Sequence, residues 1–270
     1  MDSQEIPVLN QSAQAWPYLK VSRAESHIAE LRGRVNTWLA SDPISHRAAI
    51  NEDRLGWTLH LVVRQAPPLE EWATIVGDIV HNLRTALDAL VWTLATADGR
   101  EPDRPTQVQF PIVLNSNNWD VEARRRLSDL PAKHVDRIKS LQPFNHPAGE
   151  EDHNALALLH RLDIDDKHRA GLTARVTPAG AEHEGQVEFY SAEAAARNVP
   201  PRTIVHEPVI GSDALLIEET TDDPISTVKG NFRLSLILGV ETQHGAVPLF
   251  ETLQALHTAT VTTLGIVRAE

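Results

Sequence analysis

Apolar residues recur at intervals of three and four along several stretches of the chain, which is the pattern of amphipathic helices. The clearest stretches are residues 20–39, 69–97, 150–165 and 248–268, and shorter ones lie near 117–127 and 131–141. The stretch 69–97 follows two prolines and carries Glu70 and Glu71 in its first turn, where acidic side chains suit the helix dipole. Because each long stretch has one apolar side that needs a partner, the pattern predicts a bundle of about four main helices.

Alternation of the kind found in strands appears in shorter runs that Gly, Pro, Asn and Asp residues separate. Residues 46–64 predict a small hairpin with a polar turn, and residues 107–113 predict a short strand. After Gly171 the strand-like runs are 172–176, 186–190, 202–205, 214–219 and 232–240. Their spacing predicts an antiparallel β insert.

These patterns together predict an α+β protein with a helical core and a β-rich insert. The expected division is an N-terminal arm over 1–19, a helical core over 20–171 that includes the hairpin 46–64, a β-rich insert over 172–246 and a C-terminal helix over 247–270. The arm is expected to be extended or loosely docked because it holds two prolines and little periodicity. The C-terminal helix is expected to pack back on the helical core, since its apolar side needs a partner.

Composition and charge narrow the classes of function. The 270 residues include no cysteine, which excludes disulfides and thiolate metal sites. No apolar run is long enough for a membrane span, and the N-terminus has no secretory signal pattern, so we expect no membrane partner and a cytoplasmic location. The 25 basic residues stand against 37 acidic ones, which disfavours binding to an extended nucleic-acid duplex. A local Arg/His pocket for a single phosphate remains compatible with this charge.

A polar stripe runs along the helix predicted at 69–97. At the helical angle per residue, Asp78, His81, Arg84 and Asp88 fall within about 120° of one another, away from the apolar side. One interpretation is a solvent-facing or internal polar network, because every amphipathic helix has a polar side. The other is a functional pocket, because the stripe carries His, Arg and Asp rather than the usual mixture of Glu and Lys.

A second ionisable cluster lies at the end of the helix predicted at 150–165. It contains Arg161, Lys167 and His168. Cations at a helix C-terminus are stabilised by the dipole, and this alone accounts for such a group. Alternatively, Arg161 could clamp a phosphate or carboxylate while His168 acts as an acid or base near neutral pH. The candidate catalytic residues are therefore His81, Arg84, Asp88, Arg161, Lys167 and His168, and a common active site requires them to meet in one shielded hollow, which the sequence does not decide.

Two segments also carry a resemblance. The pair GDIVHNLRTALDALVW (77–92) and LLHRLDIDDKHR (158–169) resembles a group of uncharacterised bacterial proteins. Arg161, followed after six residues by His168, is similar to the motif of HEPN (higher eukaryotes and prokaryotes nucleotide-binding) domains. The resemblance implies a helical bundle with metal-independent ribonuclease chemistry at a dimer interface. It also implies that Arg161 stabilises a phosphate, that His168 assists proton transfer, that no cofactor is required and that the partner is RNA or a phosphorylated small molecule.

Two further interpretations stay open, so the sequence does not decide whether the protein is an enzyme. Asp78-x-x-His81 and Asp165-x-x-His168 match the carboxylate-x-x-His spacing of di-metal bundles, which suggests a metal-dependent enzyme on a ferritin-like bundle. The other alternative is a non-catalytic binding or structural module with a buried polar network. No metal or cofactor is expected on the HEPN-like interpretation or on the non-catalytic interpretation.

Overall fold

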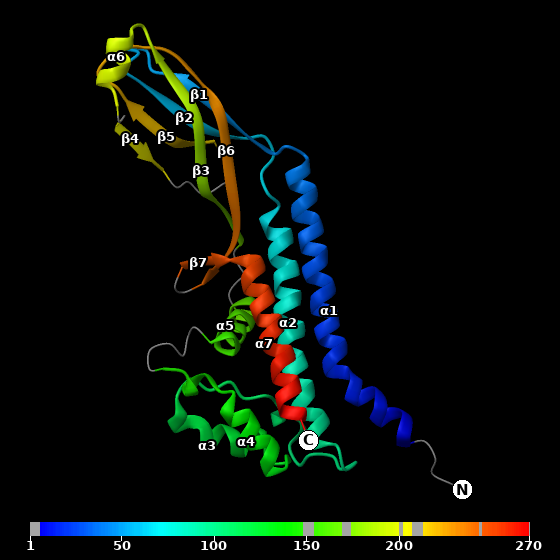
Figure 1. Cartoon of the computed structure of the whole chain (residues 1–270). Coiled ribbons are helices and arrows are strands. Elements are labelled where there is room, and N and C mark those ends of the chain that lie inside the picture. Colours follow the sequence, from blue (N-terminus) through cyan, green and yellow to red (C-terminus); the bar gives the residue numbers. More distant parts are fainter. Residues whose placement is uncertain are drawn as a thin grey trace. The chain divides into compact units, whose positions relative to one another are not determined.

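A computed structural model describes residues 6–147, 154–168, 174–199, 202–206, 213–242 and 245–269 (Figure 1). The fold is mixed α+β, as predicted. The chain divides into two compact units. The first contains the described residues of Met1–Arg32, Glu71–Leu172 and Phe250–Glu270, and the second those of Gly33–Glu70 and Thr173–Leu249.

The first unit is helical. Its helices are α1 (Ile6–Ala40, of which the part up to Arg32 belongs here), α2 (Leu69–Ala95), α3 (Trp119–Arg126), α4 (Ala132–Ser140), α5 (Ala155–His168) and α7 (Leu249–Arg268). Short 3₁₀ turns occur at Pro105–Gln107, Ser116–Asn118 and Pro143–Asn145. The core is formed by fully buried residues from four of these helices, namely Leu31, Ile79, Leu83, Leu87, Leu159 and Leu253. The helices predicted at 69–97, 150–165 and 248–268 therefore occur close to their expected positions.

The N-terminal helix is longer than the pattern predicts. Residues 6–19, expected as part of an extended arm, belong to α1, which begins at Ile6 and contains Pro17. A proline removes one backbone donor and strains the turn before it, but it does not forbid a helix whose other residues are compatible. The extended-arm prediction is wrong for these residues because it treated the prolines as breakers.

Residues 107–113, predicted to be a strand, form none: Gln107 ends a 3₁₀ turn, and 108–113 pair with no strand in the part of the chain that the structure describes. The backbone of 108–113 instead bonds to side chains. The Phe110 N–H donates to Asp88 Oδ1 at 2.9 Å, and the Val113 N–H donates to Gln142 Oε1 at 2.9 Å. Val108, Phe110 and Val113 are buried, so the apolar pattern reflects core packing rather than membership of a sheet.

The second unit contains two antiparallel sheets. The four-stranded sheet has the order β1-β2-β5-β4, with β1 at Ile44–Ile50, β2 at Gly56–Val63, β5 at Ala214–Thr220 and β4 at Arg202–Val205. The three-stranded sheet has the order β3-β6-β7, with β3 at Ala174–Phe189, β6 at Ile225–Thr242 and β7 at Gly245–Pro248. A short helix, α6 (Ala192–Arg197), follows β3. The predicted hairpin is thus β1–β2, and β2 pairs with β5 as well.

Two runs predicted as separate strands are parts of one. The runs at 172–176 and 186–190 overlap the ends of β3, a 16-residue strand that pairs with β6. The Gly and Pro residues between the runs were taken as breakers, but the register between β3 and β6 shifts at Pro178/Gly180. Such an irregularity accommodates these residues inside a strand.

Candidate functional site

Arg84 and Asp88 lie one turn apart on α2. Arg84 Nη2 donates to Asp88 Oδ1 at 2.9 Å, the contact that an i,i+4 spacing on a helix allows. Arg84 is only 7% exposed, because the helix around it is buried by apolar residues such as Leu83 and Leu87. At Arg84, therefore, the polar stripe predicted from sequence lies in the interior of the helical unit and not on its surface.

The backbone of Phe110 forms a hydrogen-bonded network with the side chains of Arg84 and Asp88. Arg84 Nη2 also donates to the Phe110 carbonyl at 2.7 Å, while the Phe110 N–H donates to Asp88 Oδ1 at 2.9 Å. Phe110 itself is fully buried. One ion pair on α2 thus satisfies both backbone groups of a residue outside any helix or strand, where no ladder partner is present to do so.

This network forms part of the wall of a cavity of about 630 Å³. The wall is built from α2, the segment around Phe110, helix α3 and helix α5. The described residues that line it are Arg84, Asp88, Gln109, Phe110, Ile112, Val113, Leu114, Asn115, Asn118, Val121, Glu122, Arg126, His160 and Asp163.

Helix α5 brings Asp163 and His160 to the cavity. Leu159 and Leu162 anchor α5 in the core, which leaves Asp163 only 6% exposed at the cavity wall. Helix α5 also approaches α2 at Gly77, where an added Cβ atom would lie 2.5 Å from Asp166 Oδ1. A glycine at this position of α2 therefore leaves room for the Asp166 carboxylate.

The pKa of the Asp88 carboxyl is perturbed by burial and by neighbouring charges. Burial raises the pKa of the Asp88 carboxyl above its usual value of 3.8, and the Asp163 carboxylate raises it further. The Arg84 guanidinium, the Phe110 N–H and Arg126 act in the opposite direction. Perturbed carboxyl groups in concave sites are a common mark of function.

The second guanidinium of the cavity is held by neighbours on and near α3. Arg126 Nε donates to Glu122 Oε2 at 2.7 Å, and Arg126 Nη1 donates to Gln109 Oε1. Within the described wall, three carboxylates and two guanidiniums are present, together with the imidazole of His160. The site is therefore mixed in charge rather than a cationic phosphate cradle.

Two atoms of the Arg84–Asp88 pair keep bonding capacity. Arg84 Nη1 is buried, and among the described residues it has no hydrogen-bond acceptor. Asp88 Oδ1 accepts two hydrogen bonds, whereas no donor to Oδ2 is found in the part of the chain that the structure describes. Arg84 Nη1 has no accessible surface, so Asp88, whose side chain is 31% exposed, is the member of the pair that a ligand can reach.

The remaining predicted residues lie elsewhere or are not described. The His81 side chain is 54% exposed, with Nδ1 at 4.0 Å from Asp163 Oδ1, and it is not among the described residues of the cavity wall. Arg161 is half-buried on α5 and is likewise not among them. The side chains of Lys167 and His168 lie outside the described part, so their place in a common hollow stays a prediction.

Sequence reasoning overlooked several residues of the wall. Asp163 and His160 were visible in the ionisable run of α5, and their proximity to the buried Leu159 and Leu162 was the available signal. Gln109, Glu122 and Arg126 gave no comparable signal, because they belong to polar or loop segments without a motif.

The described side chains contain no group of three or more His, Asp or Glu residues arranged to hold a metal ion. Across the described helices, none combines the length and apolar character needed to cross a membrane.

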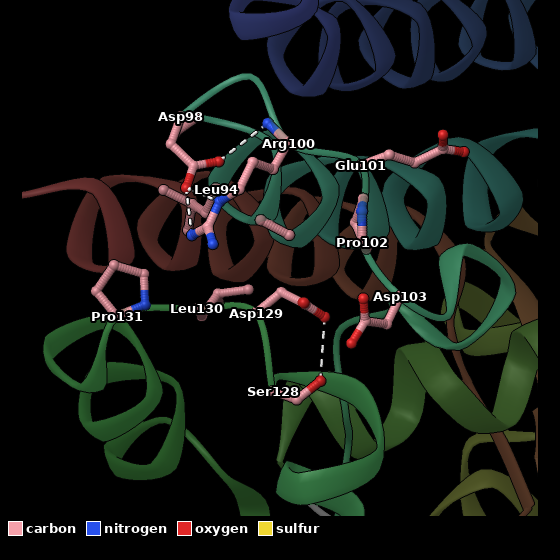
Figure 2. A pocket seen from close by; sticks show the side chains of 12 residues that line it. Leu94, Asp98, Arg100, Glu101, Pro102, Asp103, Ser128, Asp129, Leu130 and Pro131 are labelled. Atoms are coloured by element: carbon pink, nitrogen blue, oxygen red, sulfur yellow. Dashed lines mark hydrogen bonds and ion pairs between the residues drawn. The ribbon is translucent and has the colours of Figure 1, made fainter.

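A second cavity, of about 530 Å³, lies between the end of α2 and the start of α4 (Figure 2). Asp98 receives hydrogen bonds from Arg100 Nε at 2.6 Å and from the Arg100 N–H at 3.1 Å, which holds the pKa of Asp98 below its usual value. Figure 2 shows this pair across the hollow from Asp129, which accepts a hydrogen bond from Ser128 Oγ at 3.0 Å. The charged side chains of the described lining are four acids and one arginine, and the lining contains none of the candidate catalytic residues.

Comparison with known proteins identified no relative of this chain. No protein-family model, no curated protein and no solved structure matches the chain. The geometry of the site is therefore the basis for its chemistry.

Proposed function

We propose that the helical unit is a binding module for a small polar molecule, held in the cavity beside Arg84 and Asp88. The observation that carries this proposal is the network of Arg84, Asp88 and Phe110 in the cavity wall, in which the partly exposed Asp88 keeps one carboxylate oxygen without a donor among the described residues. We also propose that α1, α2, α5 and α7 form the four-helix bundle predicted from sequence.

The cavity has the character of a small-molecule site. Such sites range over roughly 300–1,000 Å³ and combine apolar walls with a few placed polar groups. Here the volume is about 630 Å³, and Ile112, Leu114 and Val121 supply apolar surface in the same wall as the Arg84–Asp88 pair. The raised pKa of Asp88 adds a perturbed titratable group to the same wall.

A cavity-filling variant tests the proposal. Val121 lines the cavity and is 57% exposed, so Val121→Trp fills space without disturbing the Arg84–Asp88–Phe110 network. A library of polar metabolites is screened for a rise in the Tm of the native protein. We expect ligands that stabilise the native protein and have no effect on Val121→Trp.

The matched control is Val199→Trp, which places the same side chain at an exposed valine of the second unit. It is expected to respond to every ligand as the native protein does. A library without any member that distinguishes the native protein from Val121→Trp contradicts the proposal.

A second candidate follows from α5. We propose, as the HEPN resemblance implies, that Arg161 and His168 act on RNA or a nucleotide phosphate without a metal, in a cytoplasmic homodimer. It is supported by the continuity of α5, which is helical over Ala155–His168. Residues seven apart in a helix lie on the same side, so Arg161 and His168 share one side of α5.

RNA cleavage in the presence of EDTA tests this candidate. The native protein is expected to cleave a fluorogenic RNA, and Arg161→Ala or His168→Ala to lose at least about a hundredfold of the rate. Arg124→Ala, on the exposed side of α3, is the control and keeps the rate. Equal rates in all four proteins, or no cleavage by the native one, contradict the ribonuclease proposal.

A further inference from the structure

We propose that the molecule held in the cavity is a small organic cation, with one ammonium group on an apolar body, and that this ammonium group donates to Asp88 Oδ2. This inference rests on the proposed binding function and names the class of ligand. It assigns the apolar body of the ligand to the exposed aliphatic side chains of the same wall.

Asp88 offers the ligand an oxygen that is accessible. Its Oδ1 accepts from Arg84 Nη2 and from the Phe110 N–H, and these two hydrogen bonds hold the carboxylate in place. No donor to Oδ2 is found in the described part of the chain, yet Oδ2 is not among the fully buried atoms that lack a partner. Oδ2 therefore has accessible surface, and Asp88 lines the cavity.

The formal charge of the wall favours a cation as the donor to this oxygen. The described lining has three carboxylates and two guanidiniums, namely Asp88, Glu122 and Asp163 with Arg84 and Arg126. Both guanidiniums already donate to carboxylates of the wall, Arg84 to Asp88 and Arg126 to Glu122. The described wall therefore has an excess of one negative charge, which a ligand with one ammonium group balances.

Asp163 strengthens the preference for a cation at Asp88. The Asp163 carboxylate raises the pKa of Asp88, as burial does, because both disfavour the ionised carboxyl. A cation at Oδ2 favours the ionised form and so acts against both effects. A neutral O–H donor could bond to the same oxygen, but it would not offset the repulsion between the two carboxylates. The charge of the ligand, and not only its hydrogen bond, therefore decides the class.

The apolar part of the wall favours an organic cation over a bare inorganic one. Ile112, Leu114 and Val121 line the cavity, and the last two are 43% and 57% exposed. Covering these aliphatic side chains with an apolar group removes both surfaces from water, which is favourable. A metal ion or a free ammonium ion has no apolar surface to contribute. An ammonium group attached to a hydrocarbon body uses both parts of the wall.

Isothermal titration calorimetry at neutral pH with two matched pairs of probes tests the assignment. Isopentylamine and phenethylamine carry an ammonium group, and isopentyl alcohol and phenethyl alcohol replace it by a neutral hydroxyl. At least one amine is expected to bind, and its alcohol to bind at least about tenfold more weakly, as the loss of a charge-assisted hydrogen bond implies. The inference is overturned if neither amine binds or if each alcohol binds as tightly as its amine.

The variant Asp88→Asn localises the effect. It keeps an oxygen that can accept from Arg84 Nη2 and from the Phe110 N–H, but it removes the negative charge and replaces Oδ2 by an amide nitrogen. Affinity for the amine is expected to fall at least about tenfold with little change in Tm. Asp98→Asn removes a carboxylate from the other cavity and is expected to leave the affinity unchanged. Loss of affinity in Asp98→Asn but not in Asp88→Asn would assign the cation to the other cavity and overturn the inference.

The outcomes separate this inference from the proposed function. If other polar ligands lose their effect in Val121→Trp while neither amine binds the native protein, the cavity is a binding site and the assignment to an organic cation is wrong. If an amine binds Val121→Trp and Asp88→Asn as tightly as the native protein, it binds outside the cavity, and the inference fails on that ground.

Discussion

The Asp88 carboxylate on α2 accepts a hydrogen bond from the backbone N–H of Phe110, with 2.9 Å between Oδ1 and N. This contact joins a helix to a segment that lies 22 residues further along the chain and has no strand partner. The same oxygen accepts from Arg84 Nη2. A single carboxylate oxygen therefore satisfies two donors, one of them a buried backbone group.

Removal of the acceptor at position 88 is expected to cost stability. Asp88→Ala leaves the Phe110 N–H and Arg84 Nη2 without this acceptor, and we expect the free energy of unfolding to fall by about 2 kcal/mol or more. Asp88→Asn retains an acceptor and is expected to change it by less than about 1 kcal/mol. Urea unfolding of the two variants measures the difference, and equal losses would contradict the proposed role of the acceptor.

The raised pKa of Asp88 predicts a pH dependence of stability. Because burial and Asp163 raise the pKa above 3.8, the folded protein binds this proton more tightly than the unfolded chain does. The contribution of Asp88 to stability is therefore greatest below the unfolded pKa, and it falls as the pH rises through the folded pKa.

Comparison with Asp88→Asn isolates this contribution, because the other titrating groups are common to both proteins. The free energy of unfolding of the native protein minus that of Asp88→Asn is expected to decrease between pH 3.8 and neutrality. Carbon-13 NMR titration of the Asp88 carboxyl should place its pKa above 3.8. A measured pKa of Asp88 at or below 3.8 would contradict the net rise that burial is expected to cause.

Gly77 is expected to resist substitution. A Cβ atom at this position would lie 2.5 Å from Asp166 Oδ1 and 2.9 Å from Asp166 Cγ, so Gly77→Ala must displace the Asp166 carboxylate from its present contacts. We expect a net loss of up to about 1 kcal/mol in the free energy of unfolding, because the displacement outweighs the better helix propensity of alanine.

Gly265 on α7 is the matched control, since an added Cβ atom there meets nothing within 4 Å. Gly265→Ala is expected to stabilise the protein by up to about 1 kcal/mol, because alanine favours the helix. Thermal unfolding compares the two variants. A neutral Gly77→Ala would contradict the prediction and show that the Asp166 side chain can move at little cost.

The C-terminus of α7 depends on side chains from α4. His134, which is buried, donates through Nδ1 to the Val267 carbonyl at 2.8 Å, and Arg137 Nη1 donates to the Ala269 carbonyl. The last carbonyls of a helix have no partner within the helix, so these side chains satisfy them. His134→Ala is expected to lower the free energy of unfolding by about 1–3 kcal/mol.

Lys133→Ala is the control, because Lys133 lies next to His134 on the same helix and is exposed. It is expected to have almost no effect, as substitutions at exposed positions usually do. Chemical unfolding of both variants is the measurement. Similar losses in the free energy of unfolding of the two variants would contradict the stabilisation of the α7 C-terminus by His134.

The sequence by itself determined the features that depend on local spacing. Periodicity at three and four residues located α2, α5 and α7 to within a few residues, because a helix forms its hydrogen bonds between neighbours in the chain. The same geometry placed Arg84 and Asp88 on one side of α2, where they form their ion pair. The hairpin β1–β2 was also visible, since its strands adjoin one turn.

Only the tertiary structure decided which distant groups meet. Phe110 showed the apolar pattern of a strand, yet its backbone bonds to α2, and no local signal states that partner. The two runs at the ends of β3 became one strand because β6, about 50 residues later, pairs along its length. Asp163, rather than Arg161, lines the cavity with Asp88 because the buried Leu159 and Leu162 orient α5. Such contacts depend on the packing of the whole unit, which the spacing of residues along the chain does not encode on its own.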